Sequence, residues 1–143
     1  MTSTGDSMSK TLKVLVVDDF EMMRFVLAKG LREMQVKDIQ EAANGREAID
    51  KLTKEADAGA PFDIVFCDWN MPEATGLEVL EFCRVMPAYK NMPFVMVTAE
   101  AESQSVIKAV KSGATDYIVK PISPEDLAKK LHKIFAKTNL KAA

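Results

Sequence analysis

Four short apolar runs in this sequence each end at a residue that could bind a cation or a phosphoryl group. The runs and the residues that follow them are Val14–Val17 with Asp18 and Asp19, Ile64–Cys67 with Asp68, Phe94–Val97 with Thr98, and Tyr117–Val119 with Lys120. Such runs are typical of strands buried on both faces. If the strands are parallel, their carboxyl ends share the sheet edge where ligands bind in open α/β folds. The sequence therefore predicts one pocket with three carboxylates, a hydroxyl and an ammonium group, which suits a divalent cation and a phosphoryl group.

The charges of this pocket indicate its chemistry. Two carboxylates about 4 Å apart repel by about 4 kcal/mol at an effective dielectric constant of 20, and a divalent cation offsets that repulsion. Oxygen ligands from Asp19, Asp68 and a backbone carbonyl, completed by water, suit Mg²⁺. Lys120 and the Thr98 hydroxyl could each hold a phosphoryl oxygen. A carboxylate held between a metal and a lysine can attack a phosphoryl group and form an acyl phosphate.

The elements that must position these residues alternate along the chain. Strands are expected at about 13–18, 39–43, 63–68, 94–98 and 116–120, and helices at about 23–34, 46–55, 76–85, 102–112 and 123–138. Regular alternation predicts an α/β fold of the (βα)5 type, with a parallel sheet, right-handed crossovers and helices on both faces. Gly30 lies inside the apolar stripe of the first helix, where it costs roughly 1 kcal/mol relative to alanine, so we expect close packing there.

Composition limits the class of protein. The chain has 143 residues, of which 48% are hydrophobic and 28% charged, and its net charge is −2. These values fit one globular domain and give no reason to expect a nucleic acid or an anionic membrane as partner. There is no apolar stretch near the ~20 residues that span a bilayer and no signal-peptide pattern, so a cytoplasmic location is expected. Residues 1–11 are predicted to be a disordered tail, 12–138 the domain, and 139–143 a C-terminal tail.

Other residues have structural interpretations. Cys67 and Cys83 are expected to be reduced residues of the core or its boundary, since a single pair is no disulfide framework. His132 and its neighbouring lysines 129, 130, 133 and 137 are expected on a solvated helix face. Trp69 could be a pocket wall or a partner contact, or a partly exposed loop aromatic, and the sequence leaves these alternatives open.

Six stretches carry a family resemblance: Val14–Phe20, Asp68–Pro72, Gly76–Glu78, Val97–Ala101, Gly113–Ala114 and Tyr117–Pro121. They resemble the receiver domains of two-component response regulators, and most of all the stand-alone chemotaxis regulators of the CheY type. The resemblance extends over about residues 12–135 and implies a flavodoxin-like strand order of 2-1-3-4-5. The chain departs from many members in having Glu73-Ala74-Thr75 before Gly76, and the 57–61 region is longer than in the best-known members.

The resemblance implies roles for individual residues. Asp68 would be the phospho-acceptor, and Asp18, Asp19, Asp68 and the backbone carbonyl of Asn70 would hold Mg²⁺. Thr98, Ala99 and Lys120 would bind the phosphoryl group. Thr98 and Ala99 would also belong to the switch, with Tyr117 as the switch aromatic. The positions that modulate dephosphorylation would be Asn70 and Glu100. The partner surface would comprise Ala101, Val106, Tyr117, Val119, Ile122, Lys130 and Lys133.

The function implied is that of a single-domain response regulator. A sensor histidine kinase like CheA would donate the phosphoryl group, and the output would be phosphorylation-dependent contact with a flagellar motor switch protein like FliM or with another protein target. A phosphatase is a further candidate partner, and the chain is expected to be a monomer. It would be no enzyme beyond catalysing its own phosphorylation and dephosphorylation.

Three alternatives to this function make different demands on the sequence. One is a phosphorelay or developmental receiver without a motor target. A haloacid dehalogenase-type phosphatase would place its nucleophile in the first strand, with a second Asp two residues on, whereas Asp68 follows the third apolar run. A flavin-binding protein of similar fold would need a Ser/Thr-rich phosphate loop where this chain has Asp18-Asp19-Phe20.

Overall fold

Apolar runs and amphipathic segments alternate in the structure as they do in the sequence. The computed structural model describes residues 11–71, 73–99 and 104–140. Their elements are β1 (Lys13–Val17), α2 (Glu21–Glu33), β2 (Asp38–Ala42), α3 (Gly45–Asp57), β3 (Ile64–Asp68), α4 (Gly76–Val85), the 3-10 turn η1 (Pro87–Tyr89), β4 (Phe94–Thr98), α5 (Gln104–Lys111), β5 (Asp116–Val119) and α6 (Pro124–Thr138). Each expected strand and helix is present, with ends that differ by a few residues.

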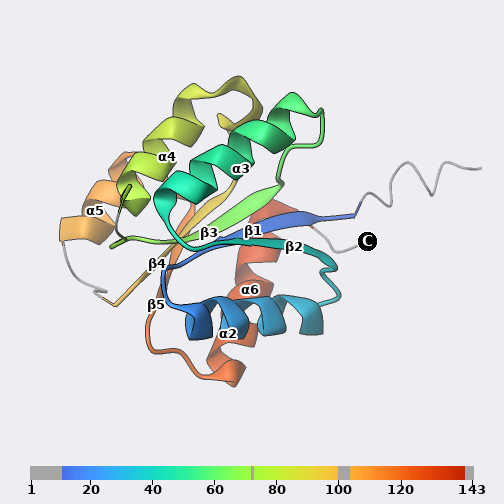
Figure 1. The fold of residues 1–143 in the computed structure, drawn as a ribbon. Helices are drawn as coiled ribbons and strands as arrows, with labels where there is room; N and C mark the ends of the chain where they lie inside the picture. Colours follow the sequence, from blue (N-terminus) through green and yellow to red (C-terminus); the bar gives the residue numbers. More distant parts are fainter. Residues whose placement is uncertain (1–10, 72, 100–103, 141–143) are drawn as a thin grey trace, which may run out of the picture.

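The five strands form one parallel sheet in the order β2-β1-β3-β4-β5. Helices α3, α4 and α5 cover one face of the sheet, and α2 and α6 cover the other (Figure 1). This arrangement confirms the predicted (βα)5 fold and its strand order. It also brings the carboxyl ends of β1, β3, β4 and β5 to the same edge of the sheet.

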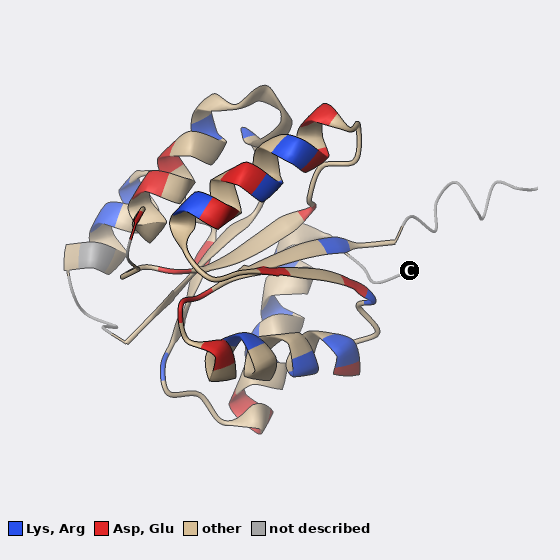
Figure 2. Cartoon of the chain, viewed as in Figure 1, with Lys and Arg blue, Asp and Glu red and all other residues tan. Residues whose placement is uncertain are grey.

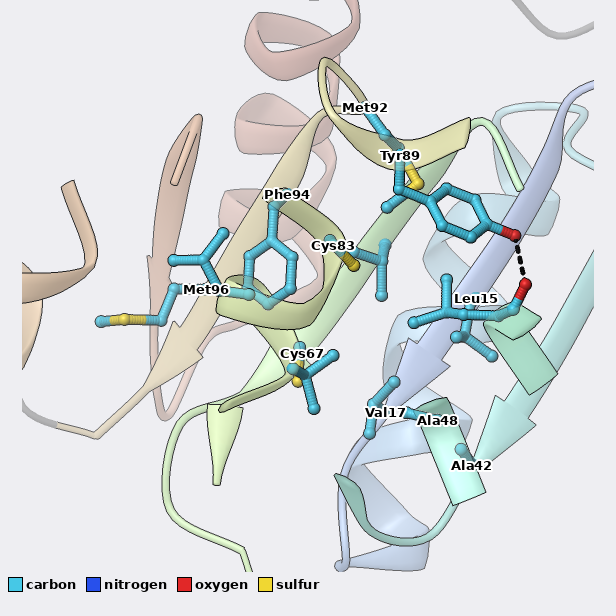
Figure 3. Close-up of a cluster of buried hydrophobic side chains, with 14 of the residues drawn as sticks. Leu15, Val17, Ala42, Ala48, Cys67, Cys83, Tyr89, Met92, Phe94 and Met96 are labelled. Carbon is cyan, nitrogen blue, oxygen red and sulfur yellow. Dashed lines mark hydrogen bonds between the residues drawn. The ribbon is translucent and has the colours of Figure 1, made fainter. Parts of the chain in front are cut away.

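Each face of the sheet has its own hydrophobic core. The core beneath α3 and α4 includes Cys67, Cys83 and Tyr89, all fully buried. The Tyr89 hydroxyl donates a hydrogen bond of 2.8 Å to the Leu52 carbonyl (Figure 3), so its polar group is satisfied inside this core. Both cysteines are free thiols, as predicted.

The second core lies between the sheet and helices α2 and α6 and includes Leu27, Leu31, Leu127 and Leu131. A Cβ atom at Gly30 would lie 2.8 Å from Leu127 Cδ2, which confirms that this glycine allows close helix packing.

Capping side chains define where three helices begin. The Asn44 side chain accepts from the Glu47 backbone at the start of α3, and Ser123 does the same for Asp126 at α6. Thr75 forms a capping box with Glu78 at the start of α4. That capping box lies just before Gly76, where the sequence departs from many family members, so the departure leaves α4 with a well-defined start.

Some expectations concern residues that the structure does not describe. Apart from Thr11, the predicted N-terminal tail lies outside the described residues, as do residues 141–143. Glu100, Ala101 and the predicted start of the fourth helix at Glu102 are outside them too. Within the part of the chain that the structure describes, no helix has the length and apolar character needed to cross a membrane.

Candidate functional site

Three carboxylates meet at the carboxyl edge of the sheet. Asp18, Asp19 and Asp68 each offer an oxygen, and these oxygens all lie within 4.8 Å of one another. Asp18 and Asp68 are buried, whereas Asp19 is exposed. Figure 2 shows acidic residues at this edge of the sheet. The cluster expected from the ends of the apolar runs is therefore present in the fold.

Asp18 is held in place by the segment that follows β1. The Asp18 N–H donates to the Ala42 carbonyl at 3.1 Å, which extends the pairing of β1 with β2 by one bond. Asp18 Oδ1 accepts from the Phe20 N–H at 2.9 Å, and Arg24 Nη1 donates to the Asp18 carbonyl at 2.8 Å. These bonds turn the chain out of the strand, so that adjacent Asp18 and Asp19 both reach the cluster.

Lys120, which follows the edge strand β5, brings a positive charge into the cluster. Its Nζ lies 2.8 Å from Asp18 Oδ2 and 3.4 Å from Asp68 Oδ1. Burial opposes the charged form of Lys120, but contact with Asp18 and Asp68 outweighs it and raises the pKa of the ammonium group. Lys120 is therefore a fixed cation between two buried carboxylates. The sequence had predicted its approach to a phosphoryl group but not its contact with Asp18.

The pKa of Asp68 is raised from 3.8 to about 6. Burial is the largest cause, because it removes the water that solvates the carboxylate, and the negative charge of Asp18 adds to it. Lys120 opposes the shift without cancelling it. Three carboxylates against one ammonium group leave a formal charge of −2, so the cluster has an excess of negative charge.

The residues present fit a divalent cation. Asp18 Oδ2 is buried and lies 2.8 Å from the Lys120 ammonium. Lys120 offsets only one of the three negative charges of the cluster, so a further cation would stabilise the remaining carboxylates. Carboxylate oxygens are also the ligands that Mg²⁺ prefers. Charge and donor type therefore agree with the expected metal, with Asp18, Asp19 and Asp68 as the carboxylates that would hold it.

Trp69 follows Asp68 and turns inward. It is 6% exposed and belongs to the core beneath α3 and α4, so the interpretation as a partly exposed loop aromatic is wrong. The backbone explains its position: the Trp69 N–H donates to the Val97 carbonyl at 3.1 Å, which continues the β3–β4 pairing past the end of the strand. Asn70 is exposed next to it, on the solvent side of the loop.

The predicted phosphoryl-binding residues lie on neighbouring strand ends. Thr98 is the last residue of β4 and is 1% exposed, and Ala99 beyond it is exposed. Asp68 pairs with Val97, so Thr98 lies one residue further toward the carboxyl edge. Lys120 follows β5, and its N–H donates to the Thr98 carbonyl at 2.7 Å. Sequence reasoning placed all three residues at this edge, and the structure brings them there.

The predicted switch aromatic, Tyr117, is half-buried on β5. The Lys130 ammonium lies 5.1 Å from the centre of the Tyr117 ring and 3.0 Å from Asp116 Oδ1. Lys137 Nζ is 3.8 Å from the other oxygen of Asp116 and donates to the Thr115 carbonyl. Lys130 is therefore half-buried against β5, which corrects the expectation for this residue, whereas Lys129, Lys133 and Lys137 are exposed, as expected of a solvated helix face.

The remaining described partner residues lie on α5, β5 and α6 and in the loop before α6. Val106, Val119 and Ile122 are half-buried, and Lys133 is exposed. His132 is exposed on α6, as expected.

An apolar patch beside the acidic cluster was missed by sequence reasoning. Phe20, Met22 and Phe25 are 63%, 59% and 57% exposed, and they line a hollow of about 630 Å³ together with Arg32 and Glu41. The signal was present in the sequence, because α2 carries large apolar residues on a second side besides its inward stripe. The patch begins at Phe20, the residue after Asp19, so it borders the mouth of the site.

Comparisons with known proteins agree with this geometry. Residues 14–132 match the family model described as the response regulator receiver domain. The chemotaxis protein CheY-3 of Vibrio cholerae serotype O1 is 39% identical over 128 residues, which is 90% of this chain and 95% of that protein.

Solved structures share the fold. The chemotaxis response regulator CheY4 of Vibrio cholerae has a TM-score of 0.77 at 35% identity, with 87% of this chain and 99% of that chain covered. The receiver domain of the sensor histidine kinase PA1611 from Pseudomonas aeruginosa has a TM-score of 0.76 at 18% identity, covering 92% and 100% of the two chains. That receiver domain was crystallised with a magnesium ion coordinated in its active-site cleft.

Proposed function

The chain belongs to the response regulator receiver family, and from that premise we propose that it accepts a phosphoryl group from a histidine kinase on Asp68 in a Mg²⁺-dependent reaction. One observation carries the proposal: Asp68 is buried, is grouped with Asp18 and Asp19, and lies 3.4 Å from the Lys120 ammonium. A buried carboxylate beside a fixed cation is suited to attack phosphorus, because the developing charge is neutralised without reorganisation.

The proposed transfer uses groups at the carboxyl edge of the sheet. An ionised oxygen of Asp68 attacks the phosphorus, and the bond from phosphorus to the donor's imidazole nitrogen breaks, leaving its electron pair on that nitrogen. Lys120 holds one phosphoryl oxygen by charge, and the hydroxyl of Thr98 and the N–H of Ala99 hold others. The carboxylates of Asp18, Asp19 and Asp68 and the carbonyl of Asn70 would hold the Mg²⁺ ion. When bound, Mg²⁺ supplies two positive charges that offset the formal −2 of the cluster.

Phosphorylation would also change the face around Tyr117. Thr98 moving toward the phosphoryl group would vacate space for the Tyr117 ring, and a partner that favours the new arrangement would bind the phosphorylated form more tightly. The proposed contacts are Ala101, Val106, Tyr117, Val119, Ile122, Lys130 and Lys133. Asn70 and Glu100 are proposed to modulate dephosphorylation.

The partners are proposed from the relatives. CheY-3 and CheY4 are chemotaxis proteins, which supports a CheA-like kinase as donor and a FliM-like motor switch protein as target. A receiver of another phosphorelay, without a motor target, is the alternative outcome. Titration of a FliM-like peptide against the beryllofluoride and free forms separates the two, since only the motor regulator should bind about 10- to 100-fold more tightly when activated.

The phosphoryl transfer has a direct test. Radiolabelled acetyl phosphate should label the protein with Mg²⁺ and not with EDTA, and the label should be stable to acid and labile to alkali, as an acyl phosphate is. Asp68→Asn should lose the label because an amide is no nucleophile. Asp50→Asn, an exposed site on α3, is the matched control and should keep it. Full labelling of Asp68→Asn would identify another acceptor and refute the assignment.

A further inference from the structure

Gly45 stands where a helix meets the loop that follows the proposed phospho-acceptor. It is the first residue of α3 and is buried. A Cβ atom at this position would lie 2.2 Å from the Ala74 carbonyl oxygen and 2.7 Å from the Ala74 carbonyl carbon. Both neighbours are backbone atoms, so no side-chain rotation relieves the overlap. The helix and the loop can approach this closely because residue 45 has no side chain.

The loop between Trp69 and Thr75 is fixed at both of its ends. The Trp69 N–H is bonded to the Val97 carbonyl, and the Gly76 N–H donates to the Trp69 carbonyl at 2.9 Å. A Cβ atom at Gly76 would lie 2.5 Å from the Asp68 carbonyl oxygen, so the two ends of the loop are packed backbone to backbone. Trp69 and Met71 are buried in the core beneath α3 and α4. Besides these contacts, the described part of the loop meets α3 at Ala74.

Helix α3 is the more rigid partner in this contact. It has 13 residues, its first turn is capped by Asn44, and Ala48 and Leu52 are fully buried against the sheet. The described residues of the loop between Asn70 and Ala74 belong to no helix or strand, and Glu73 has a positive φ of 71°. A side chain added at Gly45 therefore displaces the loop before it displaces the helix.

We infer that Gly45 is a positioning residue for the metal site: by letting Ala74 pack against α3, it sets where the Asn70 carbonyl lies relative to Asp68. The inference rests on the proposed function, in which that carbonyl is a Mg²⁺ ligand. Mg²⁺ demands near-ideal octahedral geometry at about 2.0–2.1 Å, so a shift of a few tenths of an ångström in a ligand lowers its affinity. Residues that orient a ligand typically change metal affinity about 10- to 100-fold when altered.

The test is a Mg²⁺ titration of the metal-free protein, followed by the fluorescence of Trp69, which adjoins Asp68. Gly45→Ala should raise the Mg²⁺ midpoint about 10-fold or more, and circular dichroism should show that the variant is folded. Gly30→Ala is the matched control: it makes the same substitution, but its new Cβ meets the flexible end of Leu127 in the core on the opposite face. Its Mg²⁺ midpoint should equal that of the wild type.

Two further variants separate a loop effect from general damage. Ala74→Gly in the Gly45→Ala background removes the Ala74 Cβ, which lies 2.7 Å from the new Cβ, and gives the loop more freedom, so it should recover part of the lost affinity. Ala74→Val enlarges the same contact from the loop side and should weaken Mg²⁺ binding even if Gly45→Ala does not fold.

The outcomes are distinct. A wild-type protein that does not respond to Mg²⁺ would refute the proposed metal site itself. A wild type that binds Mg²⁺, with folded Gly45→Ala and Ala74→Val variants that bind it equally well, would overturn the positioning role of Gly45 alone.

Discussion

Replacing Asp68 with asparagine should stabilise the metal-free protein at neutral pH while removing its proposed reaction. Asp68 is 6% exposed and its pKa is raised to about 6, chiefly by burial and next by the charge of Asp18. A carboxyl group whose pKa is higher in the folded than in the unfolded protein favours folding when it is protonated. That stabilisation is complete below pH 3.8 and is lost as the pH rises through about 6.

The size of the effect follows from the two pKa values of 3.8 and about 6. Each pKa difference of one corresponds to about 1.4 kcal/mol, so the ionised Asp68 costs the fold about 3 kcal/mol at pH 7 relative to a neutral group of the same shape. At pH 5 most of the native protein carries the proton on Asp68, whereas the unfolded chain is ionised there, and roughly half of that cost remains. Asp68→Asn should therefore be more stable than wild type by up to about 3 kcal/mol at pH 7, with a smaller difference at pH 5.

Urea unfolding followed by circular dichroism in EDTA measures these free energies at pH 7, 6 and 5. Asp50→Asn, on the exposed side of α3, should match the wild type at each pH and controls for the change from Asp to Asn. A gap between Asp68→Asn and wild type that is absent at pH 7, or that widens toward pH 5, would refute the reasoning. Either result would mean that the attraction of Lys120 for the Asp68 carboxylate exceeds the combined cost of burial and of repulsion by Asp18.

Three further predictions concern other parts of the molecule. We expect a phosphorylated kinase to contact the apolar patch of Phe20, Met22 and Phe25 beside the cleft. Phe25→Ser should therefore slow transfer from the kinase by about 10-fold and leave labelling by the small donor acetyl phosphate unchanged. Equal slowing of both reactions would contradict this expectation. Lys130→Met should free the Tyr117 ring by removing a cation–π contact of about 0.5–1 kcal/mol. In the ¹⁹F NMR spectrum of fluorotyrosine-labelled protein, the freed ring should give an additional or narrower resonance. The control Lys133→Met, at an exposed site, should not show this change. Burial raises the pKa of both cysteine thiols, that of Cys83 to about 12. An aromatic disulfide reagent at pH 8 should therefore react with Cys67 and Cys83 only in denaturant. Reaction with the native protein, seen as release of the reagent's aromatic thiolate, would contradict this prediction.

Much of the fold could be predicted because local patterns encode it. Apolar runs that end in polar residues specified the strands, and their alternation with amphipathic helices specified a parallel sheet. Once the strands are parallel, Asp18, Asp68, Thr98 and Lys120 must meet at one edge, whatever the details of packing. The clustering of these residues was therefore determined by sequence, while their individual roles came from family resemblance and stay predictions.

Tertiary structure decided the features that depend on the path of the chain between elements. Trp69 is buried because its N–H continues a strand pairing, which no pattern around residue 69 reveals. Lys120 contacts Asp18 as well as Asp68 because its side chain crosses from β5 toward β1. Gly45 begins α3, and it lies against a backbone carbonyl 29 positions later in the sequence, at Ala74. Periodicity and residue type determine which face of an element is buried, but contacts between distant loops exist only once the whole sheet has assembled.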